Sequence, residues 1–224
     1  MPTTLITGAN RGIGLALARE FTARGHDVIA TARDPGAAGE LKETGASVYR
    51  LDVANADEIA TLASELEGQP IDVLLNNAGI SGGRQPVGET DFDSFLETLV
   101  VNTLAPVRML EAFTANVAAG ELKRMVVITS QLGSIANTDA SWGMIYRTSK
   151  AAVNMAYRTA AVALAEQGIT CLALHPGHVE TDMGGAGAPV KPADSARGLA
   201  GVILDTPPAG ELRFLDYQGK TLPW

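Results

Sequence analysis

Short, continuously apolar runs alternate with longer amphipathic stretches along the whole chain, and this alternation restricts the fold more than any other feature. Strand-like runs occupy residues 3–7, 28–32, 47–51, 73–75, 125–129, 169–175 and, more weakly, 212–215. Helical patterns occupy residues 13–24, 57–66, 92–117 and 144–167. Continuous apolar runs are typical of strands covered on both faces, as in a parallel sheet. We therefore predict an α/β fold, a doubly wound parallel sheet of about seven strands with helices on both faces.

The organisation of the chain favours one domain over residues 1–224. A length of 224 residues suffices for one open sheet and its helices, and no low-complexity linker or internal repeat divides the sequence. A Gly/Pro-rich stretch, residues 184–192, separates the sixth strand from a later helix. We interpret that stretch as a mobile loop over a site at the carboxyl ends of the strands.

Composition and charge exclude several classes of function. A net charge of −8 argues against a nucleic-acid partner, which requires clustered lysine and arginine. The single cysteine, Cys171, rules out an intrachain disulfide, and its apolar surroundings predict a core residue. The histidines His26, His175 and His178 lack the spacing of a zinc pair, so no metal site is predicted. With no signal peptide or apolar run of membrane-spanning length in the sequence, we expect a cytoplasmic protein.

A glycine-rich turn follows the first strand and leads directly into a helical pattern. Gly8, Gly12 and Gly14 stand at the spacing Gly-x-x-x-Gly-x-Gly. Glycines permit a tight turn and close approach, and free amides at a helix N-terminus attract a pyrophosphate. Such turns also arise from packing alone, but the position after the first strand favours nucleotide binding. We predict a Rossmann-type, NAD(P)-binding domain.

The end of the second strand favours NADP(H) over NAD(H). NAD-binding sites place an acidic residue here for the ribose hydroxyls, whereas this chain has Ala32 followed by Arg33. The guanidinium groups of Arg33 and of Arg11, inside the glycine turn, can pair with a 2′-phosphate. Asp34 follows closely, and a solvated role for Arg33 remains the alternative.

Tyr146 and Lys150 are four residues apart near the start of a long helical pattern, so both side chains can face one cleft. Lowering the pKa of a tyrosine from about 10 to about 7 takes roughly 4 kcal/mol. One ammonium about 4 Å away, at an effective dielectric near 20, supplies about that much. We therefore predict that Lys150 lowers the pKa of Tyr146 and makes it an acid–base group. Taken alone, such a pair is more often a surface contact.

Several motifs in order resemble the short-chain dehydrogenase/reductase family, and the resemblance covers nearly the whole chain. The matching residues are Gly8, Gly12 and Gly14, the run Asn76-Asn77-Ala78-Gly79, Asn102, Ser130, Tyr146 with Lys150, and Pro176-Gly177 followed by Val179, Thr181 and Asp182. The distance of sixteen residues between Ser130 and Tyr146 and the short region after Thr181 depart from the common pattern. Together with the sequence of residues 213–224, they resemble the C-factor and Sniffer-like carbonyl reductase branch.

The resemblance implies an NADP(H)-dependent oxidoreductase that interconverts a ketone or aldehyde and an alcohol by hydride transfer. Tyr146 would exchange the proton with the substrate oxygen, and Ser130 would hydrogen-bond that oxygen. Lys150 would also hold the nicotinamide ribose, and Asn102 would organise a water beside Lys150. Ser134, four residues beyond Ser130, is the rival serine, although a loop hydrogen-bonding role suits it better.

The resemblance also implies the cofactor contacts. Asp52 and Val53 would meet the adenine, although Asp52 also suits the approach to a helix that begins after Asn55. The expected cofactor-binding residues are Gly8, Asn10, Arg11, Gly12, Ile13, Gly14, Arg33, Asp52, Val53, Asn76, Ala78, Gly79, Tyr146, Lys150, Pro176, Gly177, Val179 and Thr181. Residues 80–84, 132–142 (with Trp142) and 181–190 are expected to line the substrate pocket.

Two alternatives come from other functional classes. The first is a non-catalytic, NADP(H)-binding regulatory or signalling protein, against which the four filled catalytic positions argue. The second is a sugar-nucleotide epimerase or dehydratase, for whose additional substrate domain 224 residues leave no room. The helical patterns over residues 92–117 and 144–167 are long, and the second is rich in alanine, which favours close helix packing. As the resemblance also implies, we expect a symmetric homodimer or a homotetramer acting on a small molecule.

Overall fold

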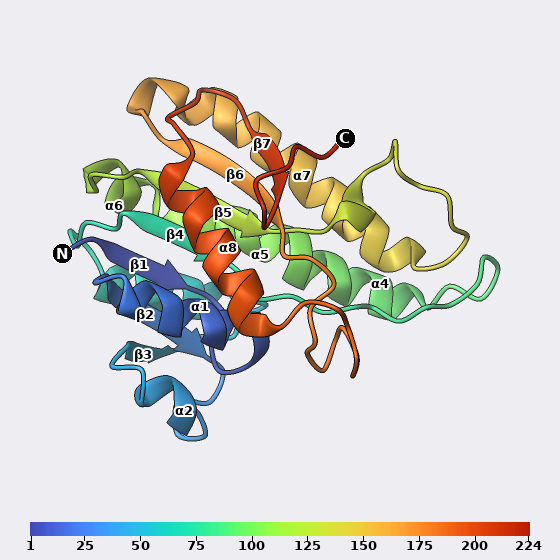
Figure 1. Cartoon of the computed structure of the whole chain (residues 1–224), viewed down its shortest axis with the longest axis horizontal. Helices are drawn as coiled ribbons and strands as arrows, with labels where there is room; N and C mark the ends of the chain where they lie inside the picture. The colour runs from blue at the N-terminus through green and yellow to red at the C-terminus, as the bar shows by residue number, and fades with distance from the viewer.

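The computed structural model describes residues 1–224 and contains one sheet of seven parallel strands (Figure 1). The strands are β1 (Thr3–Ile6), β2 (Asp27–Ala32), β3 (Ser47–Arg50), β4 (Val73–Asn76), β5 (Arg124–Ile128), β6 (Thr170–His175) and β7 (Arg213–Asp216). Their order across the sheet is β3-β2-β1-β4-β5-β6-β7, so the direction of winding reverses between β1 and β4. Ligands of such sheets bind at the carboxyl ends of the strands beside that reversal. The predicted doubly wound fold is confirmed.

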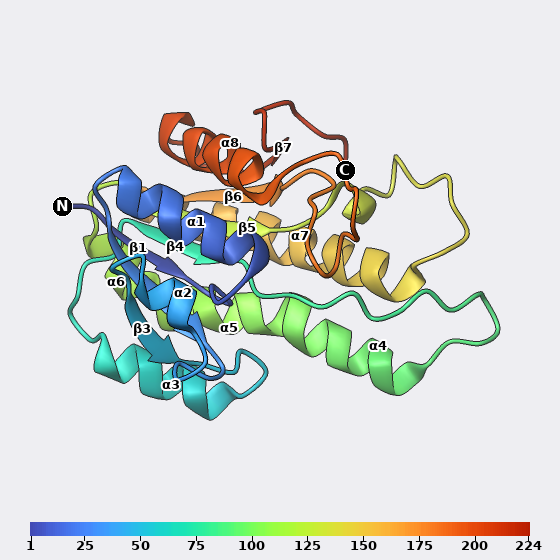
Figure 2. The same ribbon diagram turned by 60° about the horizontal axis from the view of Figure 1, so that its bottom comes forward.

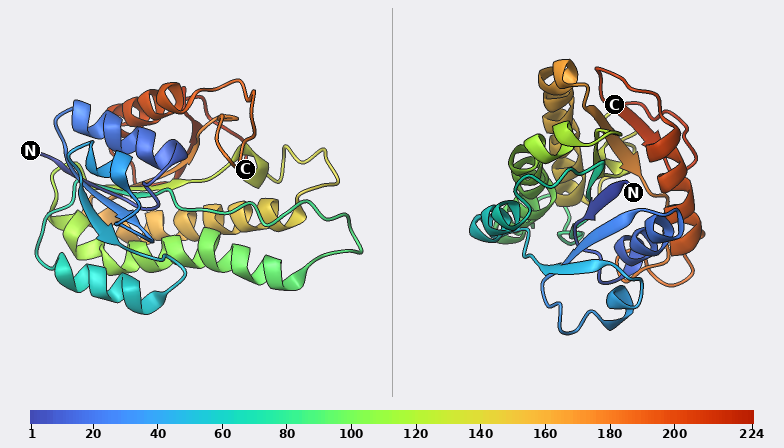
Figure 3. Two further views of the ribbon diagram at one scale, coloured as in Figure 1. Left: turned by 90° about the horizontal axis from the view of Figure 1, so that it is seen from below. Right: turned by 90° about the vertical axis from the view of Figure 1, so that its left-hand side faces the viewer.

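Helices cover both faces of the sheet. The α-helices are α1 (Gly12–Ala23), α2 (Gly39–Lys42), α3 (Ala56–Glu65), α4 (Phe92–Leu99), α5 (Ala105–Ala112), α6 (Thr114–Ala119), α7 (Met144–Leu164) and α8 (Pro192–Asp205). Three short turns of other helix types are η1 (Val100–Leu104), η2 (Gln131–Gly133) and η3 (Ala165–Gln167). Helices α1 and α8 lie on one face, and α3, α5 and α7 lie on the other (Figure 3). None of the helices combines the length and apolar character needed to cross a membrane.

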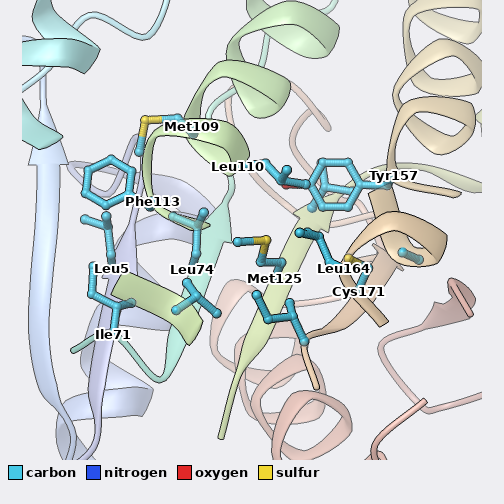
Figure 4. Packing of buried hydrophobic residues seen from close by; sticks show 14 of the residues in the cluster. Leu5, Ile71, Leu74, Met109, Leu110, Phe113, Met125, Tyr157, Leu164 and Cys171 are labelled. Atoms are coloured by element: carbon cyan, nitrogen blue, oxygen red, sulfur yellow. The ribbon is translucent and has the colours of Figure 1, made fainter. Parts of the chain in front are cut away.

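Two buried clusters, one on each face, explain why the strands read as continuous apolar runs. Consecutive strand residues point to opposite faces, so Leu5 joins the cluster under α3, α5 and α7, while Ile6 joins the one under α1 and α8. Leu74 and Leu75 divide in the same way. Figure 4 shows the first cluster, in which Phe113 lies over the sheet beside Leu5. Cys171 is fully buried in that cluster, as predicted.

The prediction of one continuous helix over residues 92–117 is wrong. The segment forms α4, the π-type turn η1, α5 and α6, with the last break at Phe113. Pro106 has no N–H to donate to the carbonyl of Asn102, so the α-helical ladder cannot pass that residue. The wider π-type turn occurs at this point. The break matters because Asn102, a predicted site residue, lies within it.

Residues 221–224 fold back along the outer edge of β7. Thr221 pairs with Leu215 in an antiparallel bridge, and the Leu222 N–H donates to the Phe214 carbonyl at 2.8 Å. The ring of Trp224 then stacks on that of Phe214, with centroids 5.2 Å apart. The edge strand is therefore covered by the chain itself.

Candidate active site

The glycine turn between β1 and α1 has the geometry of an anion cradle. A side-chain carbon at Gly14 would lie 2.4 Å from the Gly8 carbonyl oxygen, so only glycine fits there. Gly8 itself has a φ of +64° and packs against Ala78. The first turn of α1 carries no acidic residue, and its N-cap, Arg11, makes no side-chain capping bond. The amides at this helix end are therefore left for an anionic ligand.

The segment after β4 braces this turn. The Asn77 Nδ2 donates to the carbonyl oxygens of Thr7 at 3.0 Å and Gly8 at 3.1 Å. The Thr7 hydroxyl accepts from the backbone N–H groups of Asn77 at 3.0 Å and Ala78 at 3.2 Å. Asn76 instead points into the core, where it donates to the hydroxyl of Tyr157 at 2.7 Å. Of the two asparagines, Asn77 shapes the turn, although the sequence analysis selected Asn76.

Two arginines, Arg33 and Arg11, lie near the expected adenosine end together with the carboxylates of Asp34 and Asp182. Arg33 is exposed directly after the buried Ala32. The carboxylate of Asp34 accepts from the N–H groups of Gly36 at 2.8 Å and Ala37 at 3.3 Å, so it caps its own turn. Arg11 forms an ion pair with Asp182 at 2.7 Å. These positions agree with the predicted preference for a 2′-phosphate.

The structure shows one of the two roles considered for Asp52, that of a residue in the turn leading to α3. It follows β3 at the carboxyl edge of the sheet, where adenine contacts were expected together with the neighbouring Val53. Its carboxylate also accepts from the Ala54 N–H at 3.0 Å, while its own N–H donates to Glu58 at 2.7 Å. Asn55 is the N-cap of α3. The adenine contact stays a prediction.

Tyr146 and Lys150 lie on one face of α7, as predicted. The Lys150 ammonium nitrogen is 5.6 Å from the centroid of the Tyr146 ring and donates to the Ile128 carbonyl at 2.9 Å. Lys150 is only 4% exposed. Ser130 is buried after β5, and its hydroxyl accepts from the Leu132 N–H at 3.1 Å.

Burial, and not the neighbouring lysine, dominates the acid–base properties of this group. It raises the pKa of Tyr146 to about 12, while a side-chain hydrogen bond with Ser130 acts in the opposite direction. Burial also lowers the pKa of Lys150 to about 8. The prediction that Lys150 lowers the pKa of Tyr146 is therefore wrong for this structure. The phenol is desolvated, and the ammonium is turned toward the Ile128 carbonyl.

Asn102, in η1, joins the segment after β4 to α7. Its side-chain oxygen accepts from the Ile80 N–H at 2.9 Å, and its side-chain nitrogen donates to the Ile80 carbonyl at 2.8 Å and the Ser149 hydroxyl at 3.0 Å. Ser149 in turn donates to the Tyr146 carbonyl at 2.8 Å. A side-chain carbon at Gly79 would lie 3.6 Å from the Lys150 Nζ. Ser149 is a site residue that the sequence did not point to, and Ile80, expected only within the pocket segment 80–84, is here the partner of Asn102.

The turn after β6 approaches the glycine turn. Gly177 has a φ of +86°, and a side-chain carbon there would lie 3.0 Å from the Tyr217 ring. Val179 is buried and pairs with Val190, which returns the chain toward the sheet. A side-chain carbon at Gly12 would lie 3.3 Å from a Thr181 methyl group. The expected cofactor residues Gly12 and Thr181 are thus brought together.

Two residues near the expected substrate pocket have clear structural partners. The Ser134 hydroxyl donates to the Trp224 carbonyl at 3.1 Å and accepts from the Asn137 N–H at 3.1 Å, which agrees with a loop hydrogen-bonding role. Trp142 lies between the guanidinium groups of Arg84 and Arg147, whose carbons are 4.8 and 4.9 Å from its ring centroid. Trp142 thus joins the loop before α7 to the loop after β4.

Comparison with known proteins identifies the family. Residues 2–189 match the family model described as short chain dehydrogenase. The chain belongs to this family. It is 43% identical to C-signal from Myxococcus xanthus over 156 residues, which is 69% of this chain and 93% of that protein. The predicted family is therefore confirmed.

Solved structures of two carbonyl reductases resemble this short-chain dehydrogenase over its full length. Carbonyl reductase Sniffer of D. melanogaster superposes with a TM-score of 0.93 at 30% identity, covering 100% of both chains. The NADPH-bound carbonyl reductase from chicken fatty liver superposes with a TM-score of 0.92 at 31% identity, covering 100% of this chain and 99% of that one. With C-signal, these relatives agree with the C-factor and Sniffer-like branch.

Proposed function

We propose that this chain is an NADP(H)-dependent oxidoreductase that interconverts a ketone or aldehyde and an alcohol. The observation that carries the proposal is the continuity of the site. Ala78 packs against Gly8 of the anion cradle, and the next residue, Gly79, lies beside the Lys150 ammonium. A dinucleotide whose pyrophosphate lies at the glycine turn would therefore extend toward Tyr146 and Ser130, which lie next to each other.

The residues present fit NADP(H). The uncapped end of α1 suits the pyrophosphate, and the exposed Arg33 suits the 2′-phosphate, while Asp34 is engaged in its own turn. Arg11 would have to exchange its ion pair with Asp182 for the same phosphate. A relative of known structure binds NADPH. Lys150 would hold the nicotinamide ribose, and Val179 with Thr181 the carboxamide. When bound, the cofactor supplies or accepts the hydride.

The side chains of this chain supply the proton and stabilise the substrate oxygen. With a pKa of about 12, the Tyr146 phenol is protonated at neutral pH, which is the form that donates a proton to a carbonyl oxygen. The Ser130 hydroxyl, next to Tyr146, would hydrogen-bond the same oxygen as charge develops on it. Both features support Tyr146 as the proton donor, and Ser130 as the hydrogen-bond donor, when a carbonyl is reduced.

Substitution of the phenol tests the proposal directly. Tyr146→Phe should lower the turnover of a panel of aldehydes and ketones by roughly 10²–10⁴-fold, since it removes the proton donor. The Kd for NADPH, measured by cofactor fluorescence, should change little. Tyr49→Phe, on the half-buried strand β3, is the matched control. Wild-type turnover in Tyr146→Phe would contradict the proposed mechanism.

A non-catalytic signalling role is the second candidate, and the 43% identity to C-signal favours it. The filled positions Asn102, Ser130, Tyr146 and Lys150 favour an enzyme instead. Absorbance assays with NADPH and NADH, on carbonyl and alcohol panels, distinguish the two candidates. Tight NADPH binding without turnover of any compound would support the signalling protein.

We also propose that the protein forms a homodimer. Met155 and Val162, seven residues apart on one face of α7, are 67% and 66% exposed, and Leu96 on the neighbouring α4 is 63% exposed. Exposed apolar side chains at helical spacing suit a symmetric helix interface. Light scattering should give a dimer for the wild type and a monomer for Met155→Lys/Val162→Lys. A monomeric wild type at micromolar concentration would refute this assembly.

A further inference from the structure

Residues 221–224 connect the edge of the sheet to the loop that follows Ser130. Figures 2 and 3 show the end of the chain next to the short turn η2. The Trp224 ring is stacked on Phe214 of β7, with an angle of 26° between the rings. From this position the Trp224 carbonyl oxygen accepts two hydrogen bonds, from the Ser134 hydroxyl at 3.1 Å and the Ala136 N–H at 2.8 Å.

Of the hydrogen bonds made by residues 134–141, these two reach outside the loop, whereas Trp142 at its end is held by Arg84 and Arg147. The other hydrogen bonds of residues 134–141 stay local: Asn137 donates to the Ser134 hydroxyl, and Thr138 donates to the backbone of Ser134 and Ile135. Ser134 is 1% exposed, and its hydroxyl is used both as donor and as acceptor. Loss of the Trp224 partner would therefore leave the buried Ser134 hydroxyl without an acceptor for its proton.

On its other side, η2 packs directly on the catalytic helix. A side-chain carbon at Gly133 would lie 2.9 Å from the Lys150 backbone carbon, so the two backbones are in close contact. Ser130 is the N-cap of η2 and accepts from the Leu132 N–H. The turn that carries the serine is thus held between Lys150 on one side and Trp224 on the other.

We propose that Trp224 is a positioning residue of the active site, acting through Ser134. It would hold η2 and residues 134–142 against α7, which fixes the Ser130 hydroxyl beside Tyr146 and shapes one wall of the substrate pocket. Hydrogen-bond donors act on a substrate oxygen only in a narrow geometry. This role in the site rests on the proposed function. The restraint that Trp224 places on residues 134–142 does not depend on that function.

The first experiment measures the restraint without turnover. Amide hydrogen exchange of residues 134–142 should become at least about tenfold faster in Trp224→Ala, because the ring that positions the acceptor is gone. Trp224→Phe, which keeps a stacked ring, should restore most of the protection. Ser134→Ala keeps Trp224 and removes only the side-chain donor, so it tests the same restraint if Trp224→Ala folds poorly. Ser64→Ala, at an exposed serine of α3, is the matched control.

The second experiment measures catalysis on the same variants. Ser134→Ala should raise the KM for a carbonyl substrate about fivefold, as expected for the loss of one hydrogen bond, and Trp224→Ala about tenfold. The Kd for NADPH should stay within twofold of wild type. The KM of the double variant Ser134→Ala/Trp224→Ala should be close to that of Trp224→Ala, because both substitutions remove the same contact between residues 134 and 224.

The outcomes separate the two proposals. Unchanged exchange of residues 134–142 in both variants would overturn the positioning role. So would faster exchange combined with an unchanged KM, since the restraint would then be structural only. If the wild type reduces no carbonyl compound, the proposed function fails, and exchange alone decides whether Trp224 restrains the loop.

Discussion

The buried ammonium of Lys150 is expected to cost folding free energy in the cofactor-free protein. The side chain is 4% exposed, and a backbone carbonyl, not a carboxylate, receives its hydrogen bond. Burial lowers the pKa of Lys150 from its ordinary 10.5 to about 8. Because one pKa unit corresponds to about 1.4 kcal/mol, keeping this group charged costs about 3 kcal/mol at pH 7.

Replacing this lysine should therefore stabilise the protein while abolishing its activity. Lys150→Met keeps most of the apolar stem and removes the charge. It also leaves the Ile128 carbonyl without a donor, which costs about 1–2 kcal/mol. The variant should unfold with a free energy about 1–2 kcal/mol larger than that of the wild type at pH 7.

The stability difference should depend on pH, because the folded and unfolded chains release the Lys150 proton at different pH values. The folded wild type releases the Lys150 proton near pH 8, whereas the unfolded chain keeps it to about pH 10.5. Between these values the unfolded chain binds more protons, so wild-type stability rises with pH. Lys150→Met lacks this contribution, and its advantage should shrink between pH 8 and pH 9.5.

Urea unfolding of the cofactor-free proteins at pH 7, 8, 9 and 9.5, at one protein concentration, measures this difference. Lys42→Met, at an exposed lysine of α2, controls for the general effect of removing a positive charge. A Lys150→Met variant clearly less stable than wild type at pH 7 would refute the reasoning. So would a stability difference that does not change with pH.

Three further predictions follow from single contacts. Gly14→Ala should raise the Kd for NADPH more than about 100-fold, because its methyl carbon would lie 2.4 Å from the Gly8 carbonyl oxygen; Gly39→Ala, with open space around it, should not. Arg33→Ala should lower kcat/KM with NADPH about tenfold or more but leave kcat/KM with NADH unchanged, and an equal loss with both would contradict the 2′-phosphate contact. Burial raises the pKa of Cys171 to about 12, so the native protein should resist alkylation by iodoacetamide at pH 8, and rapid labelling would contradict this.

The apolar runs predicted the sheet well because each central strand is buried on both faces. The pattern is weakest at the edges, where the residues of β3 are only partly buried and where β7 is covered by residues 221–224. The interruption of the helix predicted over residues 92–117 was missed. The apolar pattern continues through η1, and only Pro106, four residues after Asn102, signals the break.

The sequence predicted those site residues whose relative positions depend only on their spacing along one turn or one helix. Gly14, Tyr146 and Lys150 lie where their spacing places them. The contacts of Ile80 with Asn102 and of Trp224 with Ser134 were not predictable, because they use backbone groups whose partners are distant in sequence. The pKa of Tyr146 was predicted in the wrong direction, since the sequence gives the distance along a helix but not the burial of the phenol.

The short segment after β4 joins the two halves of the site. Asn77 holds the glycine turn through the carbonyls of Thr7 and Gly8, and Gly79 leaves room for the Lys150 ammonium. Ile80 is then held by Asn102 at the π-type turn, and Asn102 reaches α7 through Ser149. Four consecutive residues therefore set the distance between the glycine turn and the Tyr146–Lys150 pair. In the proposed enzyme that distance must match one dinucleotide, so the break in the helix at Asn102 would serve the cofactor site as much as the proton-transfer site.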